Sequence, residues 1–332
     1  MKLSLTISML AGLALATGLV LYQGAGEVLG TMAALGWGFI PVAFVHVLQM
    51  VGSALGWRSL IEPVWPRPLS SLLTIRWIRE GTNGLLPVAH IGGEVIGARM
   101  LSFRGVRGDV AGASVVVDLT LEVVTQFLFT LVGLTLLLLG DIGGSAVASL
   151  LAGIALAGIA LAGFVIAQRM GLFKLVEHAL DRVMARAHWL SVEGIHGLHD
   201  AIQAIHRRPL ALAEGAGWHL LSWLLGTIEV WAALHFMGIG IGLRQALILE
   251  SLGQAARSAG FVVPSGLGIQ EGGLLLFGSM LGVPPEAALG LSLAKRLREV
   301  VLGLPAIAAW QLAEGRRLWQ RRPSSRPTPG AC

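Results

Sequence analysis

The chain has 332 residues, of which 55% are hydrophobic and only 13% are charged, and its mean hydropathy is +0.74. This balance is typical of an integral membrane protein and excludes a sizeable soluble domain. The single cysteine excludes a disulfide framework and a cysteine-based metal site. The net charge of +5 comes largely from arginine-rich loops, which favours attraction to a lipid surface over nucleic-acid binding.

The first apolar run, residues 3–21, is long enough to span a ~30 Å hydrocarbon core. We expect it to remain as a helix, and the alternative is cleavage as a signal peptide. A second run covers about residues 33–56. The segment 58–79, which holds three prolines and four arginines, is expected to be a connector at headgroup level.

Residues 83–94 read NGLLPVAHIGGE, an apolar stretch broken by Pro87 and by two glycines before Glu94. Broken backbone is tolerated at membrane depth only where it is buried in protein or lines a wet cavity. Arg79 precedes this stretch and Arg99 follows it. Positive charge on both sides predicts a re-entrant segment that returns to the face it came from.

The next spanning run, about residues 110–139, carries Asp118, Glu122 and Gln126 at four-residue intervals. This spacing places the three side chains on one helical face. Acids stacked in this way repel each other unless a cation faces them, so we expect the face to look inward, toward Arg99 or another arginine. The alternative is a register that leaves Asp118 near the membrane interface.

A glycine- and alanine-rich run at about residues 145–167 is expected to be a closely packed span. The longest polar segment follows, residues 168–209, and its apolar spacing predicts an amphipathic cytoplasmic connector between half one, about 1–140, and half two, about 141–314. The histidines of the connector match no standard metal spacing, so we expect no metal and no other cofactor.

Two further spans, about residues 210–237 and 243–263, lead into a second broken stretch, residues 254–273, which reads QAARSAGFVVPSGLGIQEGG. A charge such as that of Glu271 costs roughly 2.5 to 3.5 kcal/mol at the centre of a membrane helix. We therefore interpret the stretch as one wall of a polar site, and the alternative is an exposed loop with Glu271 in water. The last span is expected at about 286–310, before a disordered, basic, cytoplasmic tail at 315–332.

The two broken stretches resemble each other, because Pro87 precedes Glu94 by seven positions just as Pro264 precedes Glu271. Interrupted apolar segments at corresponding places in two halves indicate a transporter-type site. Chance similarity in a chain with 45 glycines is the alternative. With both termini cytoplasmic, the arginine distribution predicts an all-α polytopic membrane protein with about six transmembrane helices and two re-entrant segments in two inverted halves.

The stretches LLPVAHIGGEVIGAR (85–99) and VPSGLGIQEGG (263–273), followed by LSLAKRLREVVLGLPAIAAW, resemble the lysylphosphatidylglycerol synthase transmembrane region, also called the flippase-like domain family. GGEVIGAR and GIQEGG are most similar to its hopanoid-biosynthesis-associated members. The resemblance implies a multi-pass protein of the bacterial inner membrane that handles a hopanoid or an anionic phospholipid. A second copy and hopanoid-pathway proteins are further candidate partners. Aminoacyl transfer is not implied, because the soluble domain of the synthase members is absent.

The candidate substrate-binding residues come from the two motifs and from polar positions beside them. The resemblance carries over Pro87, Gly93, Glu94, Pro264, Gly266, Gly268, Gln270, Glu271 and Arg296. Their neighbours in sequence add Arg79, Asn83, Arg99 and Arg257.

We expect Glu94 and Glu271 to face one shared cavity. Glu271 should pair with a cation of the last span, Arg296 in preference to Lys295 or Arg298, and the two remaining cations should extend toward the interface. The three cannot all meet one carboxylate, because Arg296 points about 100° away from Lys295 on a helix.

Two functions fit these patterns. The first is a lipid transporter or flippase, in which a cavity between the motifs replaces the water around a lipid headgroup. The second is a lipid-modifying membrane enzyme or an assembly factor, with Glu94 or Glu271 as acid or base. The sequence has no recognisable nucleophile–base pair, phosphate loop or metal-binding set, so we expect a transporter without catalytic residues.

Overall fold

In the computed structural model, all the secondary-structure elements of the described residues are helices. The described residues are 17–61, 65–66, 68–86, 92–139, 197–259 and 266–320, together with residues 14, 155, 158 and 166. Pro87, Pro264, nearly all of the expected span 145–167 and connector residues 168–196 lie outside them, as do most of the first apolar run and the end of the tail.

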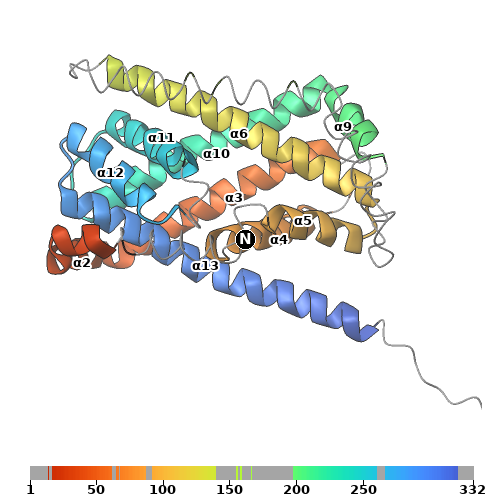
Figure 1. Ribbon diagram of the computed structural model, residues 1–332, viewed down its shortest axis with the longest axis horizontal. Helices are drawn as coiled ribbons and strands as arrows, with labels where there is room; N and C mark the ends of the chain where they lie inside the picture. Colours follow the sequence, from red (N-terminus) through yellow and green to blue (C-terminus); the bar gives the residue numbers. More distant parts are fainter. Residues whose placement is uncertain are drawn as a thin grey trace, which may run out of the picture.

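The first part of the described chain contains α2 and a short 3-10 turn, followed by four helices. Their bounds are α2 Ala25–Ala34, η1 Gly36–Gly38, α3 Phe39–Ile61, α4 Leu69–Leu85, α5 Gly92–Phe103 and α6 Gly108–Leu138. The second part contains α9 Leu198–His206, α10 Pro209–Phe236, α11 Leu243–Ala259, α12 Ile269–Met280 and α13 Pro285–Gln320. The helices lie side by side along the length of an elongated bundle (Figure 1).

Two of the described helical segments, Gly36–Ile61 and Gly108–Leu138, are long and apolar enough to cross a membrane. They overlap the spans expected from the sequence at about 33–56 and 110–139. The helices α5 and α12 have 12 residues each and are therefore about 18 Å long, too short to cross a ~30 Å core. The re-entrant character of the two broken stretches stays a prediction.

The helices α3 to α6 and α10 to α13 correspond in order and length. The first four have 23, 17, 12 and 31 residues, and the second four have 28, 17, 12 and 36. The 17-residue helix of each set packs against the long helix of the other set: α4 packs against α13, and α11 packs against α6. In Figure 1, α6 and α13 run in opposite directions along the bundle, an arrangement that inverted repeats would produce.

Glycines let the two sets of helices approach closely. A Cβ atom on Gly56 of α3 would lie 3.0 Å from the carbonyl oxygen of Gly215 in α10. A Cβ atom on Gly81 of α4 would lie 2.7 Å from the Cβ of Ala306 in α13. Small residues at such crossings are how membrane helices gain packing contact, because lipid offers no hydrophobic drive toward association.

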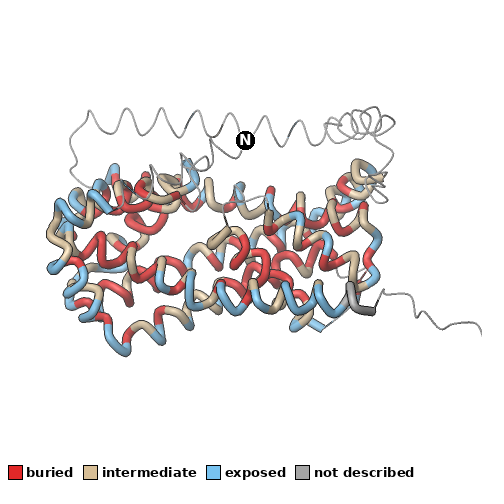
Figure 2. Tube along the Cα trace, turned by 60° about the horizontal axis from the view of Figure 1, so that its bottom comes forward, coloured by how far each residue is buried: buried red, intermediate tan, exposed pale blue. Residues whose placement is uncertain are grey.

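Two apolar clusters fill the bundle. One is formed mainly by α10, α11, α12 and the start of α13, and the other mainly by α3, α4, α5 and the start of α6. Figure 2 shows buried residues on the inner faces of the helices and exposed ones outside. The exposed residues include Phe44, Leu128, Val132 and Leu221, and large apolar side chains on the outside suit contact with lipid.

The structure changes two boundaries expected from the sequence. The segment 58–79 is not one connector, because α3 continues to Ile61 and α4 begins at Leu69. Only the proline-rich stretch between them interrupts the helices, so Arg76 and Arg79 lie within α4. At the other end, α13 continues to Gln320, past the expected end of the last span, although Pro305 lies inside it.

Candidate functional site

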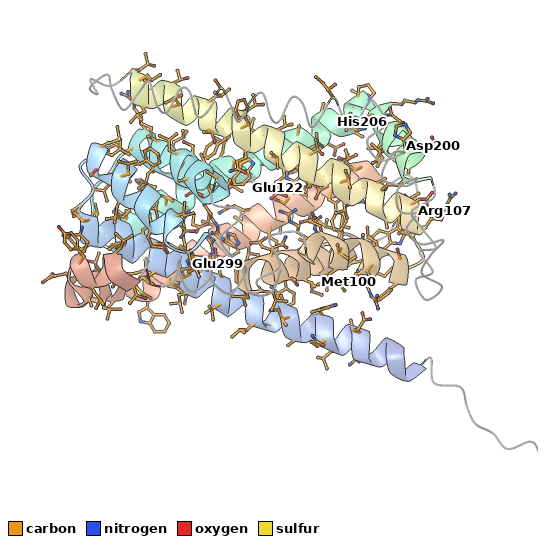
Figure 3. All side chains as sticks on the ribbon, in the orientation of Figure 1. Met100, Arg107, Glu122, Asp200, His206 and Glu299 are labelled. Atoms are coloured by element: carbon orange, nitrogen blue, oxygen red, sulfur yellow. The ribbon has the colours of Figure 1, made fainter. Side chains whose placement is uncertain are left out.

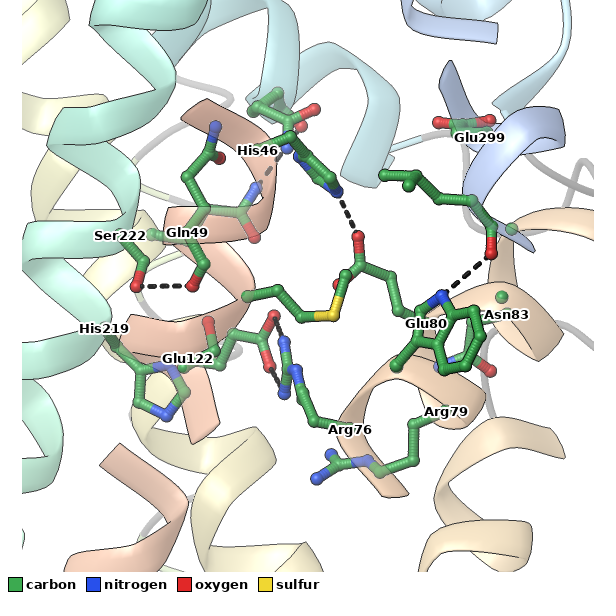
Figure 4. A pocket seen from close by; sticks show the side chains of 18 of the residues that line it. His46, Gln49, Arg76, Arg79, Glu80, Asn83, Glu122, His219, Ser222 and Glu299 are labelled. Carbon is green, nitrogen blue, oxygen red and sulfur yellow. Dashed lines mark hydrogen bonds and ion pairs between the residues drawn. The ribbon is translucent and has the colours of Figure 1, made fainter. Parts of the chain in front are cut away.

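A cavity of about 510 Å³ lies between α3, α4, α6, α10, α11 and α13 (Figure 4). Four arginines, four glutamates and two histidines line it. They are His46, Arg76, Arg79, Glu80, Glu94, Glu122, His219, Arg257, Arg298 and Glu299. Glu122 and Glu299 lie in the middle of the molecule, whereas Arg107, Asp200 and His206 lie at one end of it (Figure 3). The cavity is therefore a strongly ionic site at mid-length of an apolar bundle.

The acidic face of α6 looks inward, as its four-residue spacing predicts. Arg76 donates to both oxygens of Glu122, at 2.9 and 3.0 Å, and its Nη1 lies 3.4 Å from Asp118. Arg79 donates to Asp118 at 2.8 Å. Asp118 is fully buried, so this carboxylate needs the cations that α4 brings to it.

Arg99, which was expected to face the acids of α6, is not one of these cations and does not line the cavity. Its side chain is 57% exposed, pairs with Glu314 and lies over the ring of Phe103. The reason is direction, because α5 presents Glu94 toward α4 and α6 while Arg99 points outward to the end of α13.

The first motif forms a compact polar network. Arg79 pairs with Glu94, and the Nδ2 of Asn83 donates to the same carboxylate at 3.1 Å. The Oδ1 of Asn83 accepts a 2.8 Å hydrogen bond from the backbone N–H of Gly93. A Cβ atom on Gly97 would lie 2.6 Å from the Cδ of Arg79, so α5 approaches α4 through glycine. Arg79, Asn83, Gly93 and Glu94 are thus brought together.

The second motif is also hydrogen-bonded, but its glutamate does not reach the cavity. The carboxylate of Glu271 accepts from the backbone N–H of Gly268 at 2.7 Å, forming a cap at the start of α12, and from the hydroxyl of Ser292 at 2.8 Å. Gly268 has a φ of 78° and Gly266 a φ of 58°, which favour glycine at both positions. Glu271 is only 3% exposed and is not among the residues that line the cavity.

The expectation that Glu94 and Glu271 share one cavity is therefore wrong for Glu271. Its two oxygens are engaged by the cap and by Ser292, so α12 turns the carboxylate inward. Gln270 is held in the same network, because it donates to Ser292 at 2.8 Å and accepts from Arg257 at 2.9 Å.

The cations of α13 have three different partners. Arg296 is the one near Glu271, at 3.4 Å, as expected, and it also lies 3.5 Å from Glu299. Lys295 pairs with Glu250, and Arg298 pairs with Glu229. The expectation that these two extend to the interface is wrong, since both are buried and each has its own carboxylate on α11 or α10.

The long helices α6 and α13 place a glutamate at the same position. Glu122 and Glu299 are each the fifteenth residue of their helix, and both line the cavity. Each pairs with an arginine from the 17-residue helix of its own half: Glu122 with Arg76 of α4, and Glu299 with Arg257 of α11 at 2.6 Å. The two halves therefore contribute one arginine–glutamate pair each to the cavity.

Several cavity residues were not recognised from the sequence. His46 bonds to Glu80, and His219 Nε2 lies 3.0 Å from Asp118 Oδ1. Gln49 donates to Glu229 at 2.6 Å. A polar residue inside an apolar span was the available signal, because such residues almost always face the bundle interior. Among the described residues, no group of three histidine, cysteine or acidic side chains is arranged to hold a metal ion.

Comparison with known proteins gives one family. No curated protein and no solved structure matches the chain. The family described as lysylphosphatidylglycerol synthase TM region matches residues 9–306, which include every described helix up to the middle of α13. A transmembrane family agrees with the helical bundle and with its apolar exterior. The chain therefore belongs to the lysylphosphatidylglycerol synthase TM region family, a transmembrane family with a lipid-related membrane function.

Proposed function

We propose that the protein is a flippase-like lipid transporter of the bacterial inner membrane, which passes a lipid headgroup through the ionic cavity. The observation that carries this proposal is a cavity of about 510 Å³, lined by four arginines and four glutamates, inside a bundle whose outside is apolar. A polar group costs several kcal/mol to move through hydrocarbon without hydrogen-bond partners. The cavity supplies such partners while the lipid tail stays outside.

The size and rim of the cavity support this reading. Small-molecule sites occupy roughly 300 to 1,000 Å³, so a lipid headgroup fits but a whole lipid does not. Leu119 and Val123 of α6 line the cavity and are also 36% and 40% exposed. An exposed apolar strip beside an ionic cavity is the surface that a lipid would need, with its tail on the strip and its headgroup inside.

The lipid class rests on two arguments. The arginines of the cavity favour an anionic phospholipid, because guanidinium groups recognise phosphate oxygens well. The motif resemblance favours a hopanoid. Both lipids should therefore be tested. Cytoplasmic termini and association with a second copy or with hopanoid-pathway proteins stay predictions of the sequence.

Transport is preferred over lipid modification because of how the hydroxyl of Ser222, the cavity serine nearest in sequence to His219, is used. Ser222 donates to the backbone carbonyls of Gln49 and Trp218, at 3.0 and 2.9 Å. An activated nucleophile would instead donate to a base such as His219, one helical turn away.

The experiment is a vesicle assay with purified protein. Fluorescently labelled phosphatidylglycerol and a labelled hopanoid are tested separately, and the labelled lipid left in the outer leaflet is bleached with dithionite. We expect protein-containing vesicles to move at least one of the lipids from leaflet to leaflet faster than protein-free vesicles, with its mass unchanged. Transport would be contradicted if, for each of the two lipids, protein-containing and protein-free vesicles showed the same rate. A changed lipid mass would indicate an enzyme.

A blocking variant links transport to the cavity. Ser258 lines the cavity and is exposed, so Ser258→Cys in a Cys332→Ser background should accept a bulky methanethiosulfonate reagent. Reaction should slow transport at least tenfold. Ser70→Cys is the matched control, since Ser70 is exposed in the first turn of α4 and is not a cavity residue. Equal inhibition of both labelled variants would place the lipid path elsewhere.

A further inference from the structure

The ionic network of the cavity contains more acids than permanent cations. Within the described residues, the network is defined as the charged residues that line the cavity and the residues joined to them through ion pairs. Its cations are Arg76, Arg79, Arg257, Arg296 and Arg298. Its lining acids are Glu80, Glu94, Glu122 and Glu299. Behind them lie Asp118, Glu229 and Glu271. Seven carboxylates thus face five permanent cations, and the neighbouring pair of Lys295 and Glu250 leaves this difference unchanged.

Two histidines stand where this excess of negative charge can be balanced. His46 bonds to Glu80, and His219 bonds to Asp118. A net charge of minus two is unfavourable inside an apolar bundle, because burial penalises charge that has no partner. Protonation of both imidazoles would balance the network. His46 and His219 are therefore the two imidazoles of the network at which a proton can be held.

His46 lies between two carboxylates, and its Nδ1 has no hydrogen-bond partner among the described residues. Its Nε2 bonds to Glu80 of α4 (Figure 4). Its Nδ1 lies 3.4 Å from Glu229 Oε2 of α10. A neutral imidazole carries one N–H and can donate to only one of two flanking carboxylates, whereas an imidazolium can donate to both. Arg298 and Glu299 of α13 are the other charged groups that face it. Because Arg298 pairs with Glu229, loss of the proton leaves Glu80 as the carboxylate without a cation at this place.

His219 is less suited to proton exchange. It is 1% exposed, and its partner Asp118 is already held by Arg76 and Arg79. His46 has a side chain 13% exposed, and that of Glu80 is 35% exposed within the cavity. Water or a lipid headgroup can therefore reach Glu80 and His46 directly.

We propose that His46 and Glu80 form a proton-binding site and that an anionic lipid headgroup enters the cavity together with a proton. This inference rests on the proposed transport function and names its coupled ion. Protonation of His46 adds one positive charge to the cavity, which offsets the charge of a phosphate headgroup. Release of the proton restores an excess carboxylate at Glu80, which repels the headgroup. The proton comes from water on the entry side and returns to water on the exit side.

The test uses the vesicle assay with labelled phosphatidylglycerol and with pyranine enclosed as a pH indicator. For the wild-type protein, we expect the rate to rise about tenfold between pH 7.5 and pH 5.5 on the entry side, and an acid shift inside the vesicles during inward lipid movement. In His46→Gln, the rate should be independent of pH at whatever level remains. His235→Gln is the matched control, an exposed histidine of α10 outside the cavity, and it should keep the wild-type pH response.

Four results would overturn the inference, and they separate it from the proposed function. Wild-type transport of phosphatidylglycerol that is independent of pH and moves no protons would refute proton coupling and leave transport standing. Movement of the labelled hopanoid but not of phosphatidylglycerol would refute the claim that the transported headgroup is anionic, and it would leave transport standing. Absence of movement of either lipid would refute both proposals. A pH response that persists in His46→Gln would place the proton at another residue.

Discussion

Glu94 and Glu271 occupy the same position in the two halves of the molecule but have different roles. Each is the third residue of a 12-residue helix, α5 or α12. Glu94 lines the cavity and binds Arg79 and Asn83. Glu271 is buried, caps its own helix and does not line the cavity. One acid is available to a ligand, and the other is committed to structure.

The difference begins one helix earlier. Asn83 and Arg257 are each the fifteenth residue of a 17-residue helix, α4 or α11. An asparagine oxygen can accept a hydrogen bond, and Asn83 accepts the N–H of Gly93 at the start of α5. An arginine cannot accept, so in the second half Glu271 itself satisfies an N–H group at the start of α12. The asparagine in the first half and the arginine in the second thus go with two different ways of satisfying the N–H groups at the start of the short helix.

The largest expected effect is on the free energy of unfolding, and it should differ between the buried charges of the two long helices. Asp118 and Lys295 are each the eleventh residue of α6 or α13, and they carry opposite charges. Asp118→Asn removes the one buried carboxylate that Arg76, Arg79 and His219 share, and it should lower the free energy of unfolding by about 3 to 5 kcal/mol. Lys295→Met leaves only one carboxylate unpaired and should cost less. Denaturant titration in mixed micelles measures both, and an equal or reversed order would contradict the comparison.

Double-mutant cycles should distinguish the ion pairs of the two short helices. Arg79 and Glu94 make a direct charged hydrogen bond, for which we expect a coupling energy of about 1.5 to 3 kcal/mol. Arg296 lies 3.4 Å from Glu271 and is shared with Glu299, so its coupling should stay below about 1 kcal/mol. Each cycle uses the two glutamine substitutions and their combination. Strict additivity for Arg79 and Glu94 would mean that they are not energetic partners.

The cap of α12 should depend on glycine geometry. Gly268→Ala places a side chain at a φ of 78° and should cost about 1 to 2 kcal/mol. Gly272→Ala, four residues later, is the control, because a Cβ atom there would meet nothing within 4 Å. It should be neutral or stabilising by roughly 0.5 to 1 kcal/mol, since alanine favours a helix. Thermal unfolding of the two variants tests this, and equal losses would refute the role of Gly268.

The smallest effect concerns the cap that Asn83 provides. Asn83→Ala removes the acceptor for the Gly93 N–H and should cost about 1 kcal/mol. Because the loss is local, hydrogen exchange at the start of α5 should quicken about fivefold while exchange at the start of α12 is unchanged. Equal acceleration at both helix starts would indicate a general loosening instead.

Part of this architecture could be predicted from the sequence alone. Hydropathy predicted the membrane class, and the four-residue spacing of Asp118 and Glu122 predicted an inward acidic face, because both depend on short stretches of chain. Arg296 was expected as the partner of Glu271 from the family resemblance, whereas helical spacing predicted only that Lys295, Arg296 and Arg298 cannot all meet one carboxylate. Positions of polar residues within apolar helices are local information.

Tertiary structure decided which partners those residues meet. Arg76 and Arg79, rather than Arg99, face Asp118 because their side chains reach from α4 to this residue of α6, while Arg99 points to the end of α13. Lys295 and Arg298 are buried because α11 and α10 each bring a glutamate to them. Helix crossings join residues as many as 225 positions apart, such as Trp77 and Leu302. Spacing along one helix determines which way a side chain points, but only the packing of several helices determines what it meets.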